Sequence, residues 1–523
     1  MNIARSKSGA ARHGPDSPVK TANVPETPNV RARPAGRLPP IYRLLDKISG
    51  FAICFMIVFS PWAFGTTQRW SIDVMNASGF LLGLLLLAKS RIRRLTGIDP
   101  RRRRSRHASE GTGRPQANRM VELLGGLTIL ILGYIFLSAV NARATYDPVQ
   151  LRFDFRNCIN WLPHSYDSRG TWRAFWEYSA LALAFWAIRD WLLTKSDEER
   201  AVEEHIGRPR SGLPARLKLL LWVVCVNGAL VALQGILQRV TWNYKLLWIL
   251  EPRYRRDALS SFGPYNYRAN AAQFLNLIWP VALGFWWQLK SETERRGVRQ
   301  PLHHLLLPIA LVCSAGAVMT LSRGGAIVAT ASLLVLSIIW IAAVRHSDWR
   351  TKVGAAAFLA TTISVAAYLS WSGLEARFRE SGPDLSGRTR IYALSEKIVA
   401  DYPWFGTGPQ TYEQVMQLYV DRESPDEYWP DYAHNDWLQT RVTFGRIGLL
   451  LITAAMIACL LRWFGTGGIR TNPLFTSTLW VALIGCLSHA KYDLPLQINS
   501  ILFLCLVLCA ILFSTSRKRV VQR

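Results

Sequence analysis

Cysteines that could form a disulfide framework or a metal site are nearly absent outside the apolar parts of this sequence. The chain has 8 cysteines in 523 residues; only Cys158 falls in a predicted outward loop, and the other seven lie in apolar runs. Disulfide frameworks and zinc sites use cysteines grouped at short spacings in polar segments. The pattern excludes a disulfide-stapled domain and a metal cluster, and it favours thiols that pack as small apolar groups.

Acidic residues are also scarce, with 35 Asp and Glu against 62 Lys and Arg and a net charge of +27. Such an excess would fit nucleic-acid binding, but the basic residues are concentrated in three segments: 1–40, 89–119 (with RRRRSR at 101–106) and SRKRVVQR at 516–523. These segments fall on one side of the twelve-span arrangement described below. Because Lys and Arg in short loops are retained in the cytoplasm, we predict that both termini are cytoplasmic and that nucleic acid is not a partner.

The first 44 residues lack the apolar content that a folded core needs. They are basic and rich in proline, which is typical of a disordered cytoplasmic tail. They also lack the apolar stretch of a signal peptide, and we expect the first apolar run, after Asp46, to be retained as a helix.

Long apolar runs, in contrast, are abundant. Half of the residues are hydrophobic, and a helix that crosses a membrane needs about 20 mostly apolar residues. The sequence predicts an all-α integral membrane protein with about 12 transmembrane helices and one large periplasmic loop that contains short helices. The predicted spans are 47–65, 72–89, 120–140, 174–194, 216–238, 271–289, 304–322, 324–344, 353–373, 437–463, 475–490 and 495–515.

The longest outward loop follows the ninth predicted span and extends over 374–436. Up to residue 433 it holds eleven Asp and Glu against six Lys and Arg, and long loops of this kind are often functional. Ile391, Leu394 and Ile398 have helical spacing, which ends at DYP (401–403). At the end of the loop, HND (434–436) stands directly before the next apolar run.

Five segments in order resemble the O-antigen ligase and polymerase family of bacterial envelope enzymes. They are SFGPYNYRANAAQFLNLIWP (261–280), LSRGGAIVA (321–329), SGRTRIYALSEKIVADYPWFGTGPQTY (386–412), AHNDWLQTRVTFGRIG (433–448) and LSHAKYDLPLQINS (487–500). The resemblance covers 215–515, so we divide the chain into N-terminal transmembrane helices (45–214), an O-antigen ligase-like transmembrane domain (215–515) and a basic cytoplasmic C-terminus (516–523).

The resemblance implies a membrane glycosyltransferase, GT-C-like in architecture, in the bacterial inner membrane. Family members take a glycan from an undecaprenyl diphosphate carrier and join it to a hydroxyl group of another glycan, of lipid A core or of a protein, on the periplasmic side. The expected partners are that lipid-linked donor, a glycan or lipid A-core acceptor, and membrane lipids. No nucleotide sugar, metal or other cofactor is expected.

The resemblance also implies which residues act. Matched to the family's motifs, the catalytic residues are His434, Arg388 and Arg323. The expected substrate-binding residues are Arg268, Arg390, Asn435, Asp436, His489 and Asp493. The chain departs from the family at Thr443, where a glutamate is common, and at Tyr267 and Ala269, where asparagines flank the first arginine.

These residue types suit the reaction. When a sugar-to-diphosphate bond breaks, the lipid diphosphate gains negative charge, and arginine offers a planar, permanently charged fork to phosphate oxygens. The acceptor hydroxyl must lose a proton, and a histidine, whose ordinary pKa is about 6.5, accepts one near neutral pH.

Each assignment has an alternative. His434 could lie in a polar turn in which Asn435 or Asp436 caps the next helix, and Arg323 could be an interfacial arginine. Arg388 and Arg390 could be solvated, and His489 with Asp493 could only cap a helix pair.

Two other functions stay open. A polysaccharide polymerase would share this architecture and chemistry and differ in its acceptor. A transporter would instead place ionisable residues in the middle of its helices.

Overall fold

The apolar runs predicted from the sequence form helices in the computed structural model of the chain. The described residues are 38–98, 115–206, 212–243, 245–252, 260–297, 301–343, 381–420, 430–465 and 468–517, with five isolated positions between 353 and 375. The long helices are α1 (Pro40–Trp62), α2 (Arg69–Thr96), α3 (Pro115–Val140), α4 (Ser168–Leu193), α6 (Ala215–Val240), α7 (Arg268–Arg296), α8 (Leu306–Met319), α9 (Arg323–Ala343), α13 (Asp436–Leu461), α14 (Pro473–His489) and α15 (Asn499–Ser514).

The predicted class, an all-α integral membrane protein, is confirmed. Within the described residues, 7 helices are long and apolar enough to cross a membrane. The count of 12 spans is not confirmed. Helices α4 and α7 are not among the seven, and α14 and α15 have only 17 and 16 residues. The span predicted at 353–373 lies outside the described residues, apart from isolated positions.

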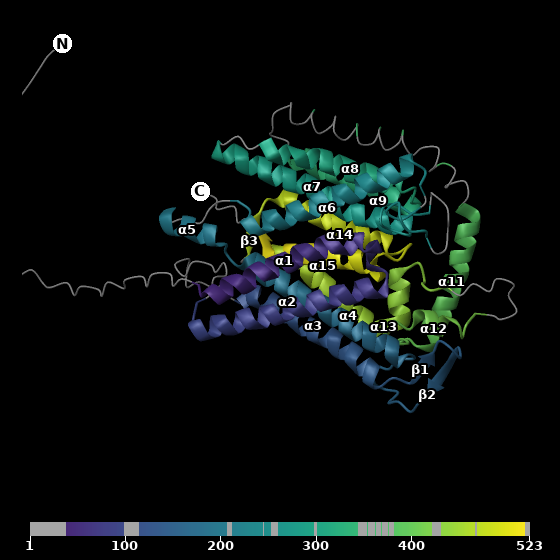
Figure 1. Ribbon diagram of the computed structural model, residues 1–523. Helices are drawn as coiled ribbons and strands as arrows, with labels where there is room; N and C mark the ends of the chain where they lie inside the picture. The colour runs from purple at the N-terminus through teal and green to yellow at the C-terminus, as the bar shows by residue number, and fades with distance from the viewer. Residues whose placement is uncertain are drawn as a thin grey trace, which may run out of the picture. The chain divides into compact units, whose positions relative to one another are not determined.

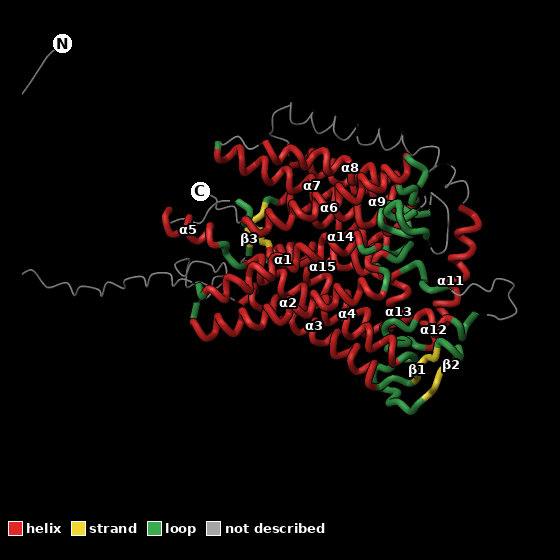
Figure 2. Tube along the Cα trace, in the orientation of Figure 1, coloured by secondary structure: helices red, strands yellow, loops and turns green. Residues whose placement is uncertain are grey.

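Shorter elements lie at the two ends of these helices (Figures 1 and 2). At one end are α11 (Ser381–Asp401), α12 (Tyr412–Met416) and the antiparallel hairpin of β1 (Ala144–Asp147) and β2 (Arg152–Phe155), which together we call the cap. At the other end are α5 (Asp197–Ile206) and β3 (Ile469–Thr471), which pairs in parallel with β4 (Thr515–Arg517). Four 3₁₀ turns complete the described elements: η1 (Phe64–Thr66), η2 (Pro301–Leu305), η3 (Arg462–Phe464) and η4 (Pro495–Gln497).

Small residues allow the helices to approach one another closely. In α2, Gly79 and Gly83 form a small-xxx-small pair that faces α4. A Cβ added at Gly79 would lie 2.6 Å from the Ala180 carbonyl oxygen, and a Cβ added at Gly83 would lie 2.8 Å from the Leu183 side chain. Gly284 of α7 packs in the same way against Thr478 of α14. Because lipid is as apolar as the side chains, the hydrophobic effect does not drive helices together in a membrane, and close packing of this kind stabilises the bundle instead.

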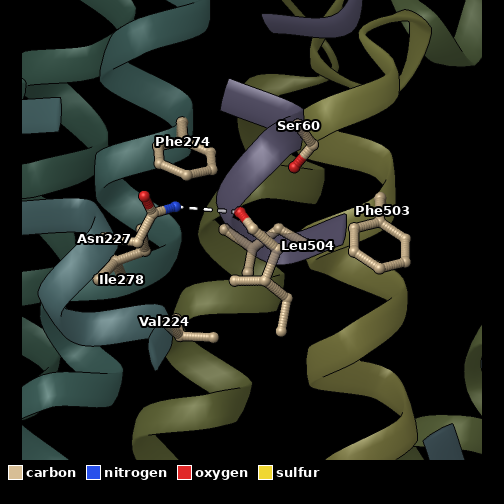
Figure 3. Close-up of a pocket in the computed structure, with 8 residues that line it drawn as sticks. Ser60, Val224, Asn227, Phe274, Ile278, Phe503 and Leu504 are labelled. Atoms are coloured by element: carbon tan, nitrogen blue, oxygen red, sulfur yellow. Dashed lines mark hydrogen bonds between the residues drawn. The ribbon is translucent and has the colours of Figure 1, made fainter. Parts of the chain in front are cut away.

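A buried side-chain amide replaces a backbone hydrogen bond that a proline removes from α1. Pro61 has no N–H, so the carbonyl of Ile57 one turn earlier has no helical partner. Asn227 of α6 donates its amide to that carbonyl at 3.0 Å and accepts from the Trp62 indole at 2.8 Å. Figure 3 shows Asn227 reaching from α6 to α1 beside a small cavity that Phe274 also lines.

Buried ion pairs join four helices at the end opposite the cap. Lys89 lies 3.3 Å from Asp46, and Arg93 lies 3.0 Å from Asp190. Arg216 donates to Asp46 as well. Because an unpaired buried charge is costly, each member depends on its partners, and the network fixes α1, α2, α4 and α6 relative to one another.

The cap has a small apolar core of its own. Ile398 and Val399 of α11 and Val415 and Met416 of α12 are buried against Val442 of α13. The sequence predicted amphipathic helices here, ending at DYP, and α11 does end at Asp401. The hairpin β1–β2, which the sequence analysis did not predict, joins the cap where Tyr146 donates to Gln417 at 2.9 Å.

Helix α13 is broken at Gly445. Its φ of 61° and ψ of −167° are values that essentially only glycine adopts. The segment 403–408 fills the break: Thr407 and Gly408 donate their N–H groups to Val442 and Thr443 at 2.8 and 3.0 Å. This insertion anchors the cap to α13, which begins two residues after the predicted catalytic histidine, His434.

Candidate functional site

His434 lies in a strained turn at the start of α13. Its φ is 49°, in the left-handed region that non-glycine residues rarely adopt. Two contacts hold this conformation: Tyr392 of α11 donates its hydroxyl to the His434 carbonyl at 3.0 Å, and the Ala433 N–H donates to Gln439 at 2.9 Å. Strained backbone of this kind persists where the surroundings fix it, often at functional sites.

Asp493 is the centre of the site. Its side chain is buried, in the turn between α14 and η4. One carboxylate oxygen lies 3.4 Å from His434 Nδ1, and the other accepts from the Tyr267 hydroxyl at 3.1 Å. His489 Nε2 is 4.0 Å from the same carboxylate. Residues that are far apart in the sequence therefore meet around one carboxylate.

The charge state of Asp493 follows from these neighbours. Burial opposes ionisation, but the hydrogen bond from His434 and the nearby charges of His489 and Arg388 outweigh it and hold the pKa of Asp493 below its usual range. A carboxylate can only accept hydrogen bonds, so Nδ1 of His434 is the donor. In that tautomer, Nε2 carries the lone pair that could take a proton.

Tyr267 is a site residue that the sequence analysis missed. It stands where related sequences have asparagine, and the sequence analysis noted it only as a departure from the family's motif. Its hydroxyl bonds Asp493, and its ring lies 6.4 Å from that of His434 in an edge-on arrangement. Burial and then the charge of Asp493 raise the pKa of Tyr267, which keeps the hydroxyl protonated as a donor.

Arg388 approaches the same group from the cap. It lies on α11 and donates to the Tyr492 carbonyl, one residue before Asp493. Its charge acts on Asp493 and on Tyr267. Arg390 lies exposed two residues farther along α11.

Arg323 begins α9, and glycines bring that helix start to the site. An added Cβ at Gly324 would lie 2.4 Å from His489 Nε2, and at Gly325 it would lie 2.4 Å from Ala272. The preceding Ser322 caps the helix by accepting from the Gly325 N–H at 3.1 Å. The motif LSRGG therefore places an arginine and the positive end of a helix beside His489, an arrangement suited to an anion.

Arg268 begins α7 and is buried, with 8% of its surface exposed. Its backbone N–H donates to the Ser260 carbonyl at 3.0 Å, and its charge acts on the neighbouring Tyr267. The structure thus brings the positive charges of Arg268 and Arg388 to the Tyr267 side chain.

Asn435 and Asp436, both predicted to bind substrate, have structural partners. The Asn435 side chain caps α13 by accepting from the Leu438 N–H at 3.1 Å. The Asp436 carboxylate accepts from the Leu496 N–H at 2.8 Å and from the Gln497 amide at 3.0 Å. Both are buried, so they shape the turn that presents His434.

His489 is nearly fully buried, with 3% exposed, and its Nδ1 has no hydrogen-bond partner among the described residues. Thr443, where related sequences have glutamate, bonds to the Gln439 carbonyl of its own helix at 2.8 Å. The described residues contain no group of three or more His, Cys, Asp or Glu that could hold a metal ion.

The arrangement combines a base with cations. His434 can accept a proton, Asp493 can orient it and stabilise its protonated form, and arginines from α7, α9 and α11 can offset negative charge. The site can therefore take up a proton and stabilise an anionic leaving group.

Comparison with known families agrees with this geometry. Residues 308–453 match the family described as O-antigen ligase (Wzy_C). That segment includes Arg323, Arg388 and His434, whereas Arg268 and Asp493 lie outside it. Comparison with curated proteins finds no match. The chain is therefore a multi-pass, mainly helical membrane protein in which residues 308–453 are similar to the O-antigen ligase family.

Proposed function

We propose that this protein moves a glycan from undecaprenyl diphosphate to a hydroxyl group of a second glycan or of lipid A core, at the periplasmic face of the bacterial inner membrane. The observation that carries the proposal is the pairing of His434 with the buried Asp493, 3.4 Å apart, beside Arg388. The similarity of residues 308–453 to the O-antigen ligase family supports this class of reaction.

In the proposed reaction, His434 Nε2 takes the proton of the acceptor hydroxyl while the acceptor oxygen forms a bond to the anomeric carbon of the donor. The bond from that carbon to the diphosphate oxygen breaks, and undecaprenyl diphosphate leaves with the electron pair. Asp493 stabilises the imidazolium that forms, as an oriented carboxylate does beside a catalytic histidine.

Arg388, Arg323 and Arg268 are proposed to hold the diphosphate. Preorganised cations that face developing charge are commonly the largest contribution to catalysis. Arginine in this role supplies the electrostatic stabilisation that a divalent cation supplies in other phosphate-transfer sites, so we propose that the reaction needs no metal.

Deletion of the gene tests the proposal. Glycans are then extracted from the envelope and from the medium and compared with those of the complemented strain. Accumulation of full-length polymer still on its lipid carrier indicates a ligase, and accumulation of single lipid-linked units indicates a polymerase. Unchanged lipid-linked and acceptor-linked glycans would contradict the proposed function.

A further inference from the structure

A carboxylate of α4 lies in the cap end of the molecule and plays no part in the proposed reaction. One oxygen of Glu177 accepts from the Asn499 amide at 2.9 Å, and the other accepts from the Gln410 amide at 2.7 Å. Gln410 lies two residues after the segment 403–408 that fills the break in α13, and its φ of 57° is strained. Glu177 therefore joins α4, α15 and the cap at one point.

Asn499 leaves a hydrogen-bonding atom unused at this point. Only 2% of Asn499 is exposed, and its Oδ1 has no partner in the part of the chain that the structure describes. A buried amide oxygen without a donor is costly. A ligand group that bonded this oxygen would be a donor, such as a hydroxyl, because an amide oxygen can only accept.

Tyr432, two residues before His434, lies near enough to Glu177 for that carboxylate's charge to act on its hydroxyl. Tyr432 is 37% exposed. Its partial burial raises the pKa of its hydroxyl to about 12, and so do the charges of the carboxylates around it, which belong to Asp431, Glu413, Glu177 and Asp436. A partly exposed aromatic ring thus lies near several carboxylates, two residues before the proposed base in the sequence.

The charges separate into two regions. The charges of Arg388 and Arg268 act on Tyr267, the hydrogen-bond partner of Asp493, whereas carboxylates act on Tyr432. A phosphate or another anion would be repelled by the second region, because like charges at close range oppose binding. Carboxylates and an amide oxygen accept hydrogen bonds from uncharged hydroxyls, and an aromatic ring offers an apolar face for the body of a sugar.

We propose that Glu177, Asn499 and Tyr432 form an acceptor subsite that binds the hydroxyls of a neutral sugar residue and directs one hydroxyl to His434. The subsite rests on the proposed function and deepens it: the sugar that receives the glycan is uncharged where it meets the enzyme. The donor diphosphate occupies the arginine region instead.

A steady-state transfer assay with Glu177→Gln tests this subsite. Cells that lack the gene supply the lipid extract as donor and the unmodified envelope glycan as acceptor, and each is titrated at a fixed concentration of the other. The substituted amide can no longer accept at both oxygens, so the half-saturating acceptor concentration should rise about tenfold or more. The half-saturating donor concentration should stay within about twofold, because the donor has no contact there.

Glu396→Gln is the matched control. Glu396 is an exposed carboxylate of α11 that pairs with Arg441 at 2.9 Å, and its loss should leave both half-saturation values unchanged. Tyr432→Ala serves as a second variant because its ring is partly exposed, so the variant can fold even if Glu177→Gln cannot. It should raise the half-saturating acceptor concentration several-fold.

The outcomes separate the two proposals. The proposed subsite would be contradicted if the half-saturating acceptor concentration were unchanged in both folded variants. It would also be contradicted if the half-saturating donor and acceptor concentrations rose equally. Either result would leave the proposed function intact. Absence of transfer by the wild-type enzyme with the same extracts would overturn both.

Discussion

Arg388 and Arg323 reach the site from different elements, α11 and α9, and both serve the same purpose in the proposed reaction. Arg388→Ala and Arg323→Ala should each lower turnover by about two orders of magnitude or more, the worth of one preorganised electrostatic contact. Lysine should rescue poorly because it keeps the charge and loses the planar fork.

Single-turnover rates of purified variants check this expectation. Arg441→Ala is the control, since Arg441 is an exposed arginine that pairs with Glu396. Full activity in both site variants would mean that the carrier diphosphate binds elsewhere.

Asp493 predicts a pH dependence of stability. Because its pKa is lowered in the folded protein, its ionised form stabilises the fold at pH values above its ordinary pKa of about 4. That stabilisation is lost as the pH falls through the lower, folded value. In detergent, the midpoint of thermal unfolding should therefore be higher for wild type than for Asp493→Asn at pH 7. The two midpoints should converge below about pH 4. A constant gap between them across this range would show that Asp493 is not ionised in the fold.

At the scale of single residues, the sequence motifs predicted some of the site residues and did not predict others. Arg388 and His434 stand in recognisable strings of letters. Tyr267 and Tyr392 also lie in matched segments, but the sequence analysis assigned them no role, because their roles depend on segments near 267, 392 and 493 meeting in space. Asp493 was predicted only as a substrate-binding residue, and its position beside His434 could be seen only in the fold.

Among the elements, the break in α13 determines how the cap is attached. Gly445→Ala should lower the midpoint of thermal unfolding, because its conformation excludes side chains and an added Cβ would lie 2.3 Å from the Trp404 carbonyl oxygen. The strain of such a backbone is about 1–3 kcal/mol before any clash is counted.

Gly133→Ala is the matched control, because an added Cβ at this helical glycine of α3 meets nothing within 4 Å. Alanine there should leave the midpoint unchanged or raise it. Equal midpoints for Gly445→Ala and wild type would mean that the break is not required.

Hydropathy predicted most of the long helices because length and apolar content determine a membrane helix. It could not reveal the break at Gly445, since a single glycine in an apolar run is compatible with an unbroken helix. The hairpin β1–β2 was missed because its four-residue strands give almost no periodic signal.

At the scale of the whole molecule, the membrane topology determines which solution the site faces. We expect the cap to be periplasmic and the α2 end to be cytoplasmic. In a Cys158→Ser background, which removes a native thiol of the cap end, Ala393→Cys on α11 should react with an impermeant thiol reagent in intact cells. Thr96→Cys at the end of α2 should react only after lysis; the reverse pattern would contradict the proposed side of the active site.

The most direct measurement is glycan transfer by purified enzyme, with undecaprenyl diphosphate release and acceptor product quantified together in EDTA. Wild type should form both in equal amounts in the presence of the chelator. His434→Gln, which keeps a polar side chain in the turn, should be folded and slower by about two to four orders of magnitude, the worth of a positioned general base. Loss of wild-type activity in EDTA with recovery on adding Mg²⁺, or full activity in His434→Gln, would contradict the account.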